Sequence, residues 1–130
     1  MKPLVLDTSV WVEFLRGHQS ELREKIRHRM LLMPATVALE LLAGGRTRES
    51  DVAVRALLEP FRRNRRVLVP SEDDHWRAGD TLARLGLGAS RHGHDVMIAV
   101  LARRFGCDLW TLNQNDFQDA SKVLGVTLGP

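Results

Sequence analysis

The sequence predicts an α/β fold in which helices cover both faces of a central parallel sheet of about five strands. Two observations lead to this fold class. Short apolar runs with β-strand character recur along the 130 residues, and segments with helical periodicity separate them. Strands that alternate with helices form βαβ units, whose parallel strands share one sheet with helices packed on each side. We therefore expect a three-layer α/β/α sandwich, built by residues 1–130 as a single domain.

Five segments fit the strands of such a sheet. Each is a short apolar run, shorter than a typical helix. In chain order these expected strands are residues 3–7, 30–34, 66–70, 108–112 and 125–128.

Seven segments between these strands show helical patterns. In chain order they are residues 9–16, 20–29, 36–43, 51–64, 72–85, 95–105 and 117–124. Ser20, Thr36 and Ser71 are the expected N-caps of three of them, and glycines end most of the segments. Pro60 should kink or end the fourth helix, because proline has no N–H to donate. The sixth helix is expected to follow a loop rich in Gly, Ser and His.

The composition indicates a folded protein with a basic surface. Hydrophobic residues make up 44% of the chain, and no apolar run is long enough to span a bilayer. The N-terminus lacks the layout of a signal peptide, and the single Cys107 cannot form an intrachain disulfide, so a cytoplasmic location is expected. The net charge is +3 and most basic residues are Arg, which fits either a polyanion partner such as nucleic acid or a solvated basic surface.

Four acidic residues stand at positions where the pattern would place other residue types. Asp7 closes the first strand, and Glu40 interrupts the apolar helix VALELLAG. Asp95 opens the sixth helix, and Asp116 follows the fourth strand. In a parallel sheet, the carboxyl ends of the strands and the early turns of the following helices project toward the same edge. All four carboxylates can therefore converge at that edge.

Each of the four carboxylates also has a purely structural explanation. Asp7 and Asp95 can cap a helix or interact with its dipole, and Asp116 can form an Asx turn. Glu40 can lie on a solvated stripe, although its apolar neighbours leave little room for one. The coincidence of all four at one edge is what favours a site. Either hydroxyl residue after Asp7 can then cap the first helix, which leaves the Asp7 carboxylate free to face the cleft.

Electrostatics decide what such a cluster needs. Two carboxylates about 5 Å apart repel each other by roughly 3 kcal/mol at an effective dielectric near 20. Four of them together have raised pKa values or splay apart unless a cation lies among them. An oxygen-only ligand set suits Mg²⁺ or Mn²⁺ rather than zinc. On an Arg-rich surface, this arrangement is typical of metal-assisted phosphodiester hydrolysis.

The segments that carry these residues resemble the PIN-domain family of nucleases, and most closely the VapC-type toxins of toxin–antitoxin pairs. They follow the family order and cover most of the chain: LVLDTSVWVEFLRG at 4–17, PATVALELLAG at 34–44, DDHWRAGDTLARLG at 73–86, which matches more loosely, and HDVMIAVLARRFGCDLWTLNQNDF at 94–117. The resemblance implies a PIN-like fold. It also implies a Mg²⁺- or Mn²⁺-dependent endoribonuclease that hydrolyses RNA as the toxin of such a pair.

The family pattern assigns roles to individual residues of this chain. It implies a catalytic set in which Asp7 and Asp95 bind the metal directly, while Glu40 and Asp116 bind it directly or through water. The polar positions that usually orient ligands, water or phosphate match these residues: Thr8 or Ser9, Thr111 and Asn113. Some family members carry Asp at the last of these positions. A neutral Asn would hold a second metal less well, which leaves open whether one metal or two bind.

The resemblance further implies protein partners. A homodimer is expected, together with a cognate antitoxin whose tail wraps the toxin and blocks the acidic cleft. The complex would bind operator DNA through the antitoxin, with no role for a membrane. Helices 20–29 and 51–64 are expected to form part of the antitoxin groove, or else to serve only the core or the dimer contact.

Two other functions compete with a nuclease. In the first, the chain is a PIN-like subunit that acts mainly in transcriptional autoregulation with a DNA-binding antitoxin. In the second, it is a receiver-like phospho-acceptor domain. The receiver chemistry needs an Asp at the end of the third strand, where this chain has Val69, Pro70 and Ser71.

Several other residues have an expected place. His92 and His94 are interpreted as part of a loop that leads into Asp95 and contacts RNA phosphate, because two His alone make a poor zinc site. Asp119 is expected to face solvent, which favours Asp116 as the acid of that segment. The three tryptophans are expected to pack in the core or at an interface: Trp11, Trp76 and Trp110.

Overall fold

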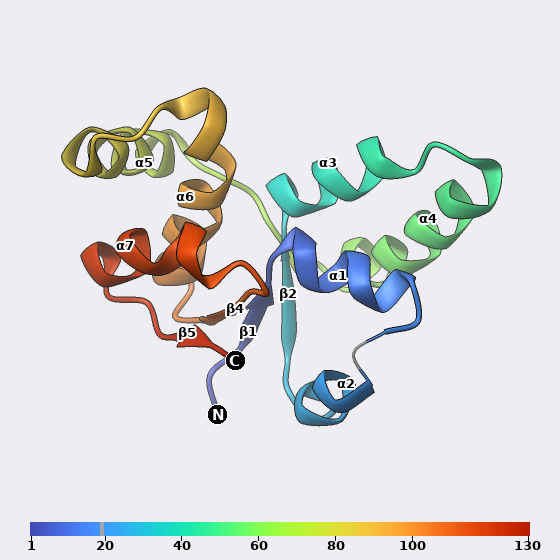
Figure 1. Ribbon diagram of the computed structural model, residues 1–130. Helices are drawn as coiled ribbons and strands as arrows, with labels where there is room; N and C mark the ends of the chain where they lie inside the picture. Colours follow the sequence, from blue (N-terminus) through green and yellow to red (C-terminus); the bar gives the residue numbers. More distant parts are fainter. Residues whose placement is uncertain (19) are drawn as a thin grey trace.

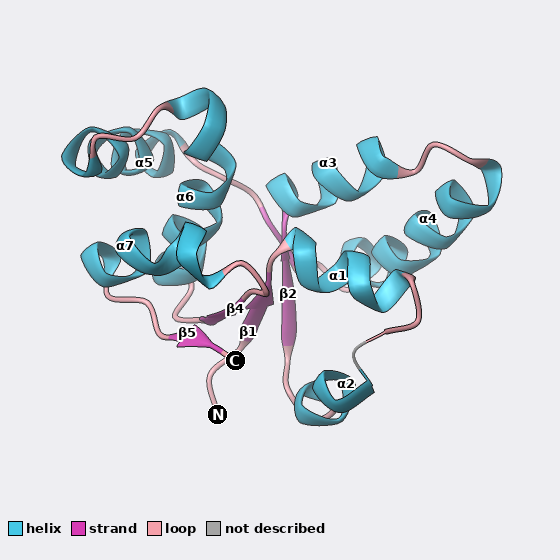
Figure 2. Ribbon diagram, viewed as in Figure 1, coloured by secondary structure: helices cyan, strands magenta, loops and turns pink. Residues whose placement is uncertain are grey.

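The computed structural model describes residues 1–18 and 20–130, which form a mixed α/β protein around one five-stranded sheet (Figure 1, Figure 2). Its strands are β1 (Leu4–Leu6), β2 (Leu31–Pro34), β3 (Val67–Leu68), β4 (Asp108–Trp110) and β5 (Leu128–Gly129). All neighbouring strands are parallel, in the order β3-β2-β1-β4-β5. The predicted parallel sheet of five strands is therefore confirmed.

The helices of the described residues form two groups, one on each side of the sheet (Figure 1). One group contains α1 (Thr8–Leu15), α2 (Ser20–Ile26), α3 (Ala35–Gly44) and α4 (Arg48–Arg63). The other contains α5 (Glu72–Leu85), α6 (Ala89–Arg104) and α7 (Gln114–Leu124). The strand order explains this division. From β1 to β3 the chain moves toward one edge, and from β4 to β5 toward the other, so right-handed crossovers place the helices on opposite faces.

The core lies where the sheet meets these helices. Leu4, Val5 and Leu6 of β1 are fully buried, as expected for a central parallel strand covered on both faces. Helix α6 carries an uninterrupted buried run from Val96 to Ala102, because it packs against α5, α7 and β4. This burial all around the helix explains why the α6 sequence lacks a polar stripe.

Helix α6 begins six residues earlier than predicted. The segment expected to be a loop is helical from Ala89, and the His92 N–H donates to the Gly88 carbonyl at 3.0 Å. Gly93 lies inside the helix, at a propensity cost of about 1 kcal/mol relative to Ala. Packing of α6 against α5 and α7 outweighs this cost. Asp95 consequently lies in the second turn of the helix and not at its start.

The helices on the other face also differ from the predicted bounds. Thr36 was predicted to cap α3, but the helix starts at Ala35, and Pro34, which enters it directly from β2, occupies the cap position. Pro60 does not end α4 at its own position, since the helix continues to Arg63. The proline lies in the last turn, where its missing N–H removes a single helical hydrogen bond.

Two further findings limit the possible functions. A receiver-like domain of the flavodoxin type has the strand order 2-1-3-4-5, whereas β3 is the edge strand here, next to β2. The receiver hypothesis is therefore wrong. Among the described residues, no helix has both the length and the apolar character needed to cross a membrane.

Candidate active site

The strand order reverses direction between β1 and β4, which are neighbours in the sheet. Chains that leave such neighbours pass to opposite faces, and the crevice between them is the usual ligand site of an open α/β sheet. Asp7 directly follows β1, and Thr111 follows β4. The sheet therefore places one predicted acid and one predicted supporting residue on either side of this crevice.

Asp7 is buried at the start of α1 and is held by three donors. Its Oδ1 atom accepts hydrogen bonds from the Ser9 hydroxyl at 2.6 Å and the Val10 N–H at 3.3 Å. Its Oδ2 atom accepts a hydrogen bond from the Thr111 hydroxyl at 2.7 Å. Burial raises the pKa of Asp7, and the hydrogen bonds from Ser9, Thr111 and Val10 oppose that rise. Asp7 is thus the N-cap of α1 as well as a site residue, and the expectation that Thr8 or Ser9 would cap in its place is wrong.

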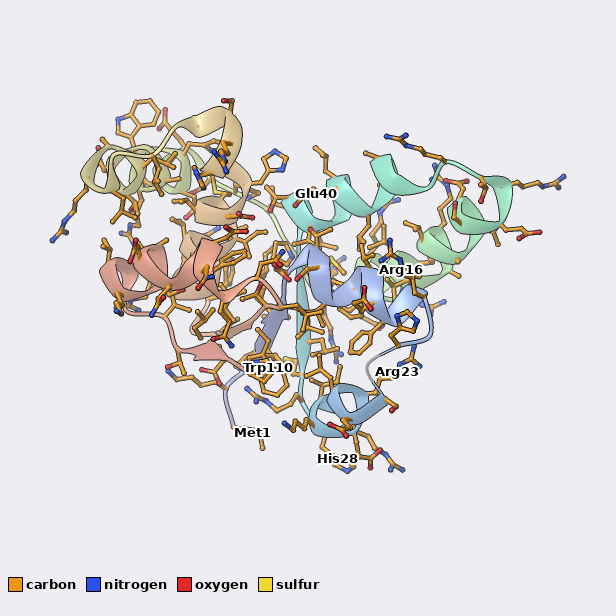
Figure 3. The ribbon with its side chains drawn as sticks, viewed as in Figure 1. Met1, Arg16, Arg23, His28, Glu40 and Trp110 are labelled. Carbon is orange, nitrogen blue, oxygen red and sulfur yellow. The ribbon has the colours of Figure 1, made fainter. Side chains whose placement is uncertain are left out.

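Glu40 lies on the side of α3 that faces α1 and α6. Its Oε1 atom accepts a hydrogen bond from the Thr8 hydroxyl at 2.9 Å and lies 3.8 Å from His94 Nδ1. Glu40 lies near the middle of α3 (Figure 3). The Glu40 side chain, 33% exposed, thus contacts α1 and α6 as well as solvent.

The pKa of Asp95 reflects both its burial and the charges of the other three acids. It is raised from 3.8 to about 6, first by burial and then by the negative charges of Asp116, Asp7 and Glu40. His92 opposes the rise. The three other acids therefore act electrostatically on Asp95. That all four converge closely enough to share a cation stays a prediction.

Asp116 is the most open member of this carboxylate cluster, which consists of Asp7, Glu40, Asp95 and Asp116. It lies in the first turn of α7 and borders a polar cavity of about 400 Å³ formed by residues 112–116. Asp119, one turn later, is exposed, and Asp116 is the one of the two whose charge acts on Asp95.

The family of the chain follows from a comparison with known proteins. A family model described as PIN domain matches residues 4–123. The chain belongs to the PIN domain family. PIN domains are generally nucleases, enzymes that hydrolyse nucleic acid. A comparison with curated protein sequences finds no match.

Solved structures with the same fold include complexes of PIN proteins. DNA-bound VapBC from Salmonella typhimurium superimposes with a TM-score of 0.74 at 22% identity, covering 98% of this PIN domain and 97% of that chain. VapBC-1 from nontypeable Haemophilus influenzae superimposes with a TM-score of 0.71 at 23% identity, covering 96% of this chain and 95% of that chain. FitAcB from Neisseria gonorrhoeae superimposes with a TM-score of 0.67 at 20% identity, covering 98% of this chain and 96% of that chain. At these identities the likeness establishes the fold.

Three of the predicted supporting residues contact the acids of this PIN domain through their side chains. The Thr111 hydroxyl, fully buried, donates to Asp7 and accepts the Asn113 N–H at 2.9 Å. The Ser9 hydroxyl donates to Asp7 and accepts the Leu112 N–H at 3.2 Å, which ties the loop after β4 to the start of α1. Thr8 contacts Glu40 instead, and Asn113 contributes its backbone N–H to the network.

His94 is a site residue whose position the sequence analysis placed incorrectly. It was expected in a loop, but it lies in α6 and reaches Glu40 on α3. The sequence shows that His94 directly precedes Asp95. Its contact with Glu40 depends on how α3 and α6 pack, which the sequence does not show. Of the two places expected for the tryptophans, core or interface, Trp11 lies in the core against Phe14 and Phe61. Trp76 is 69% exposed and so lies outside the core, and its place at an interface stays a prediction.

The donor set of the carboxylate cluster fits a hard divalent cation. Asp7 and Asp95 have raised pKa values, so a positive charge between the acids would relieve both burial and repulsion. Among residues 1–18 and 20–130, no three His, Cys, Asp or Glu side chains form a ready-made metal cage. Mg²⁺ does not require one, because it commonly keeps several waters and binds one or two carboxylates together with substrate phosphates. Cys107 is buried away from this chemistry, with its pKa raised to about 11.

Proposed function

We propose that this PIN domain is a metal-dependent endoribonuclease that hydrolyses RNA phosphodiester bonds and is the toxin of a toxin–antitoxin pair. The observation that carries this proposal is the raised pKa of Asp95, about 6, which results first from burial and then from the charges of Asp116, Asp7 and Glu40. The fold alone does not require such a cluster of acids, and a cation bound among them would offset their repulsion. Mg²⁺ or Mn²⁺ suits its oxygen ligands.

In this proposal each acid has its own role. Asp7 and Asp95 hold the metal directly, and Glu40 and Asp116 hold it directly or through water. A divalent ion bound there would lower the pKa of a water molecule and neutralise charge that develops on the phosphate. The hydrogen bonds of Ser9 and Thr111 fix both oxygens of Asp7, and Thr8 fixes Glu40, so these ligands are positioned before substrate arrives.

RNA as the substrate is supported by the charge of the chain and by its chemistry. The net charge of +3 and the Arg-rich composition favour association of the protein with a polyanion. Hydrolysis by an activated water requires no side-chain nucleophile, which agrees with the inert, buried Cys107. An RNA substrate also accords with the cytoplasmic location expected from the sequence.

A groove between α1, α3 and α4 supports the proposal of an antitoxin partner. Its volume is about 270 Å³, and Glu40 lines it beside apolar side chains. The lining residues are Val12, Leu15, Arg16, Glu40, Leu41, Gly44, Ser50, Ala53 and Val54. An extended apolar segment of an antitoxin would fill this groove and reach the acidic cleft. Of the two helices expected to form the groove, α4 contributes to this lining and α2 does not.

The proposed assembly contains a homodimer and its antitoxin. Relatives of similar fold were solved as VapBC and FitAcB complexes, and two VapBC structures contain DNA. We propose by analogy that the complex binds operator DNA through the antitoxin. Autoregulation of transcription would then be an additional role of the pair, with the carboxylate cluster retained for cleavage.

The proposal is tested by incubating the purified protein with mixed tRNA, rRNA and mRNA, with Mg²⁺ or with EDTA, and mapping the cut ends. We expect Mg²⁺-dependent internal cleavage by the wild type and none by Asp95→Ala. Expression of the wild type without an antitoxin should arrest growth, and Asp95→Ala should relieve the arrest. Equal cleavage by both proteins would exclude the proposed site.

A further inference from the structure

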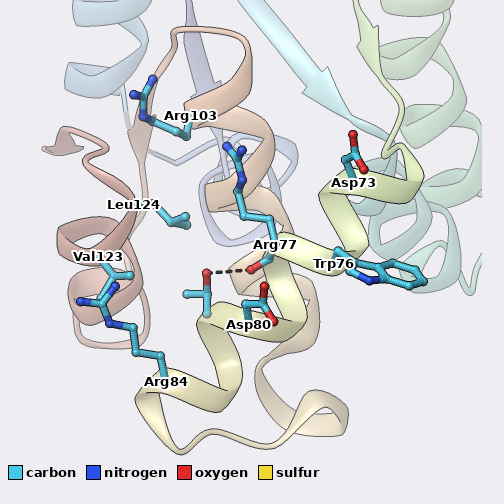
Figure 4. Close-up of a pocket in the computed structure, with 9 residues that line it drawn as sticks. Asp73, Trp76, Arg77, Asp80, Arg84, Arg103, Val123 and Leu124 are labelled. Carbon is cyan, nitrogen blue, oxygen red and sulfur yellow. Dashed lines mark hydrogen bonds between the residues drawn. The ribbon is translucent and has the colours of Figure 1, made fainter.

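A second cavity lies on the face of the molecule formed by α5, α6 and α7 (Figure 4). It has a volume of about 540 Å³ and shares no lining residue with the carboxylate cluster. Arg77 and Arg84 come from α5, Arg103 comes from the end of α6, and Val123 and Leu124 come from the end of α7. We call this cavity the arginine groove.

The three arginines of this groove are available to a ligand. Within residues 1–18 and 20–130, their guanidinium groups make no ion pair or hydrogen bond, although two acids, Asp73 and Asp80, also line the groove. Asp80 precedes Arg84 by four residues, the same spacing at which Asp51 pairs with Arg55 in α4 at 3.1 Å. Figure 4 shows Arg84 extended toward Val123 instead. The guanidinium groups therefore border the cavity and do not form ion pairs with acids of their own helices.

The chemistry of the lining favours a nucleic acid strand over a small anion. The two acids reduce the net charge of the lining from +3 to +1, which is weak for a compact phosphate ion but compatible with phosphates spread along a strand. Val123 and Leu124 provide apolar surface among the arginines, and Figure 4 shows Trp76 at the rim of the groove. With 69% of Trp76 exposed, its ring is open to stacking on a base.

The groove and the carboxylate cluster share helix α6. Asp95 and Arg103 are eight residues apart on it, about 12 Å along the helix axis, at the two ends of the buried run from Val96 to Ala102. A strand that contacts both must therefore pass over the surface around this buried run.

We propose that the arginine groove binds the backbone of single-stranded RNA outside the carboxylate cluster, with Trp76 stacking on a base. This inference rests on the proposed function, since it assigns the groove to the same substrate. Guanidinium groups at fixed positions would hold the strand through its phosphates without reading its sequence.

The test is a binding titration in EDTA, with no metal at the carboxylate cluster and hence no cleavage. A labelled single-stranded RNA of mixed sequence is titrated with wild type and with the triple variant Arg77→Gln, Arg84→Gln, Arg103→Gln at several salt concentrations. Each lost phosphate contact lowers the slope of log K against log salt by about 0.7, so the triple variant should have a slope smaller by about 2. Its affinity at low salt should fall at least about tenfold. Trp76→Ala should weaken binding by about fivefold or more, independently of salt.

The matched control removes the same charge elsewhere, in Arg27→Gln, Arg48→Gln, Arg55→Gln. All three residues are exposed, the first in the turn after α2 and the other two on α4. The control should keep most of the wild-type slope. Should the triple variant fail to fold, each single substitution is expected to lower the slope by about 0.7.

Equal slopes for the triple variant and wild type would overturn the inference, as would an equal effect of the control. A change of oligomeric mass with unchanged RNA affinity would also overturn it and identify a protein interface. Wild type that cleaves RNA but binds it independently of these arginines would leave the proposed function intact, whereas wild type that neither binds nor cleaves RNA would reject both proposals.

Discussion

At the scale of single residues, the carboxylate cluster places a charge where the fold disfavours one. Asp95 has an ordinary pKa of 3.8 and a folded-state pKa of about 6. A carboxyl whose pKa is raised by folding adds stability below the unfolded value, and that stability is lost as the pH rises through the folded value. Above about pH 6, ionised Asp95 therefore lowers the free energy of unfolding. The rise of the Asp95 pKa from 3.8 to about 6 corresponds to a loss of at most about 3 kcal/mol in the free energy of unfolding, and the partial exposure of Asp95 reduces this loss.

Replacement of Asp95 should therefore stabilise the metal-free protein while abolishing cleavage. We expect Asp95→Asn to raise Tm by about 3–8 °C at pH 7.5 in EDTA, because the substitution removes a repelled charge and no hydrogen bond of Asp95 is lost. At pH 4.5, where wild-type Asp95 is largely protonated, the difference should almost vanish. Differential scanning fluorimetry at the two pH values measures this. Asp119→Asn removes a charge from the exposed part of α7 and should change Tm little; a rise as large as that of Asp95→Asn would contradict the explanation.

Asp7 combines capping with its site role, and two substitutions separate these roles. Asn is as good an N-cap as Asp, so Asp7→Asn should keep the metal-free Tm unchanged or slightly raised. Asp7→Ala should lie about 1–2 kcal/mol below Asp7→Asn in free energy of unfolding, since the Val10 N–H loses the acceptor that the Asn oxygen still provides. Urea unfolding measures the difference, and neither variant should cleave RNA. Equal stability of the two variants would show that the cap contributes nothing.

The sequence indicated the identity of the four acids but not all of their contacts. Asp7 could be placed after a strand from its position alone, because strand ends are visible in the apolar pattern. Its bond to Thr111 joins residues 104 positions apart, and the contact of His94 with Glu40 joins two helices. Such distances depend on tertiary packing, which residue spacing does not encode.

At the scale of elements, Thr8 links the first turn of α1 to α3 through Glu40. Thr8→Val keeps the shape of the side chain and removes this hydrogen bond. We expect a loss of about 1 kcal/mol in stability, together with slower cleavage at unchanged RNA affinity in EDTA, because Glu40 loses its orientation. Single-turnover kinetics and RNA binding measure the two effects.

Thr36→Val is the matched control for this prediction. Thr36 lies one turn before Glu40 on α3, and its buried hydroxyl has no partner among the described residues. Its replacement should therefore be neutral or slightly stabilising. If Thr36→Val slowed cleavage as much as Thr8→Val, the effect would come from β-branched packing of α3 and not from the bond to Glu40.

Helix α6 shows where prediction of elements from the sequence fails. Its C-terminal half was predicted from the apolar run, and the end at Gly106 agrees with the positive φ of 66° at that residue. Its first six residues have weak helix propensity, so the local sequence favoured a loop. Packing against the preceding helix α5 and against α7 decides otherwise, and this packing is not visible in the local sequence. Helix ends defined by local chemistry, such as Ser71 and Gly86 of α5, were predicted correctly.

At the scale of the whole molecule, the strand order reverses between β1 and β4, and acids from separate segments act electrostatically on Asp95. This repulsion, together with burial, disfavours the ionised form of Asp95, and a bound cation would relieve it. Stability should therefore depend on pH and on metal in a coupled way.

Stability at low pH depends on a different residue, Asp74. Burial opposes the ionisation of Asp74, but the Ser71 N–H and Arg104 outweigh it and hold the pKa of Asp74 below its ordinary value. Its stabilisation is present above the unfolded pKa of 3.8 and is lost only as the pH falls through the lower folded value.

In EDTA, the wild-type Tm should consequently fall as the pH rises from 4.5 to 7.5, through the pKa of Asp95 near 6. Saturating Mg²⁺ should reverse this fall at pH 7.5, because an ion present at a hundred times its Kd stabilises the folded state by about 2.7 kcal/mol. At pH 4.5, protonated Asp95 binds the ion poorly, so Mg²⁺ should have little effect there. Scanning calorimetry at both pH values, with Mg²⁺ or EDTA, measures the coupling, and Asp95→Asn should lose most of the Mg²⁺ response. An equal Mg²⁺ response in wild type and Asp95→Asn would show that the ion binds outside the carboxylate cluster.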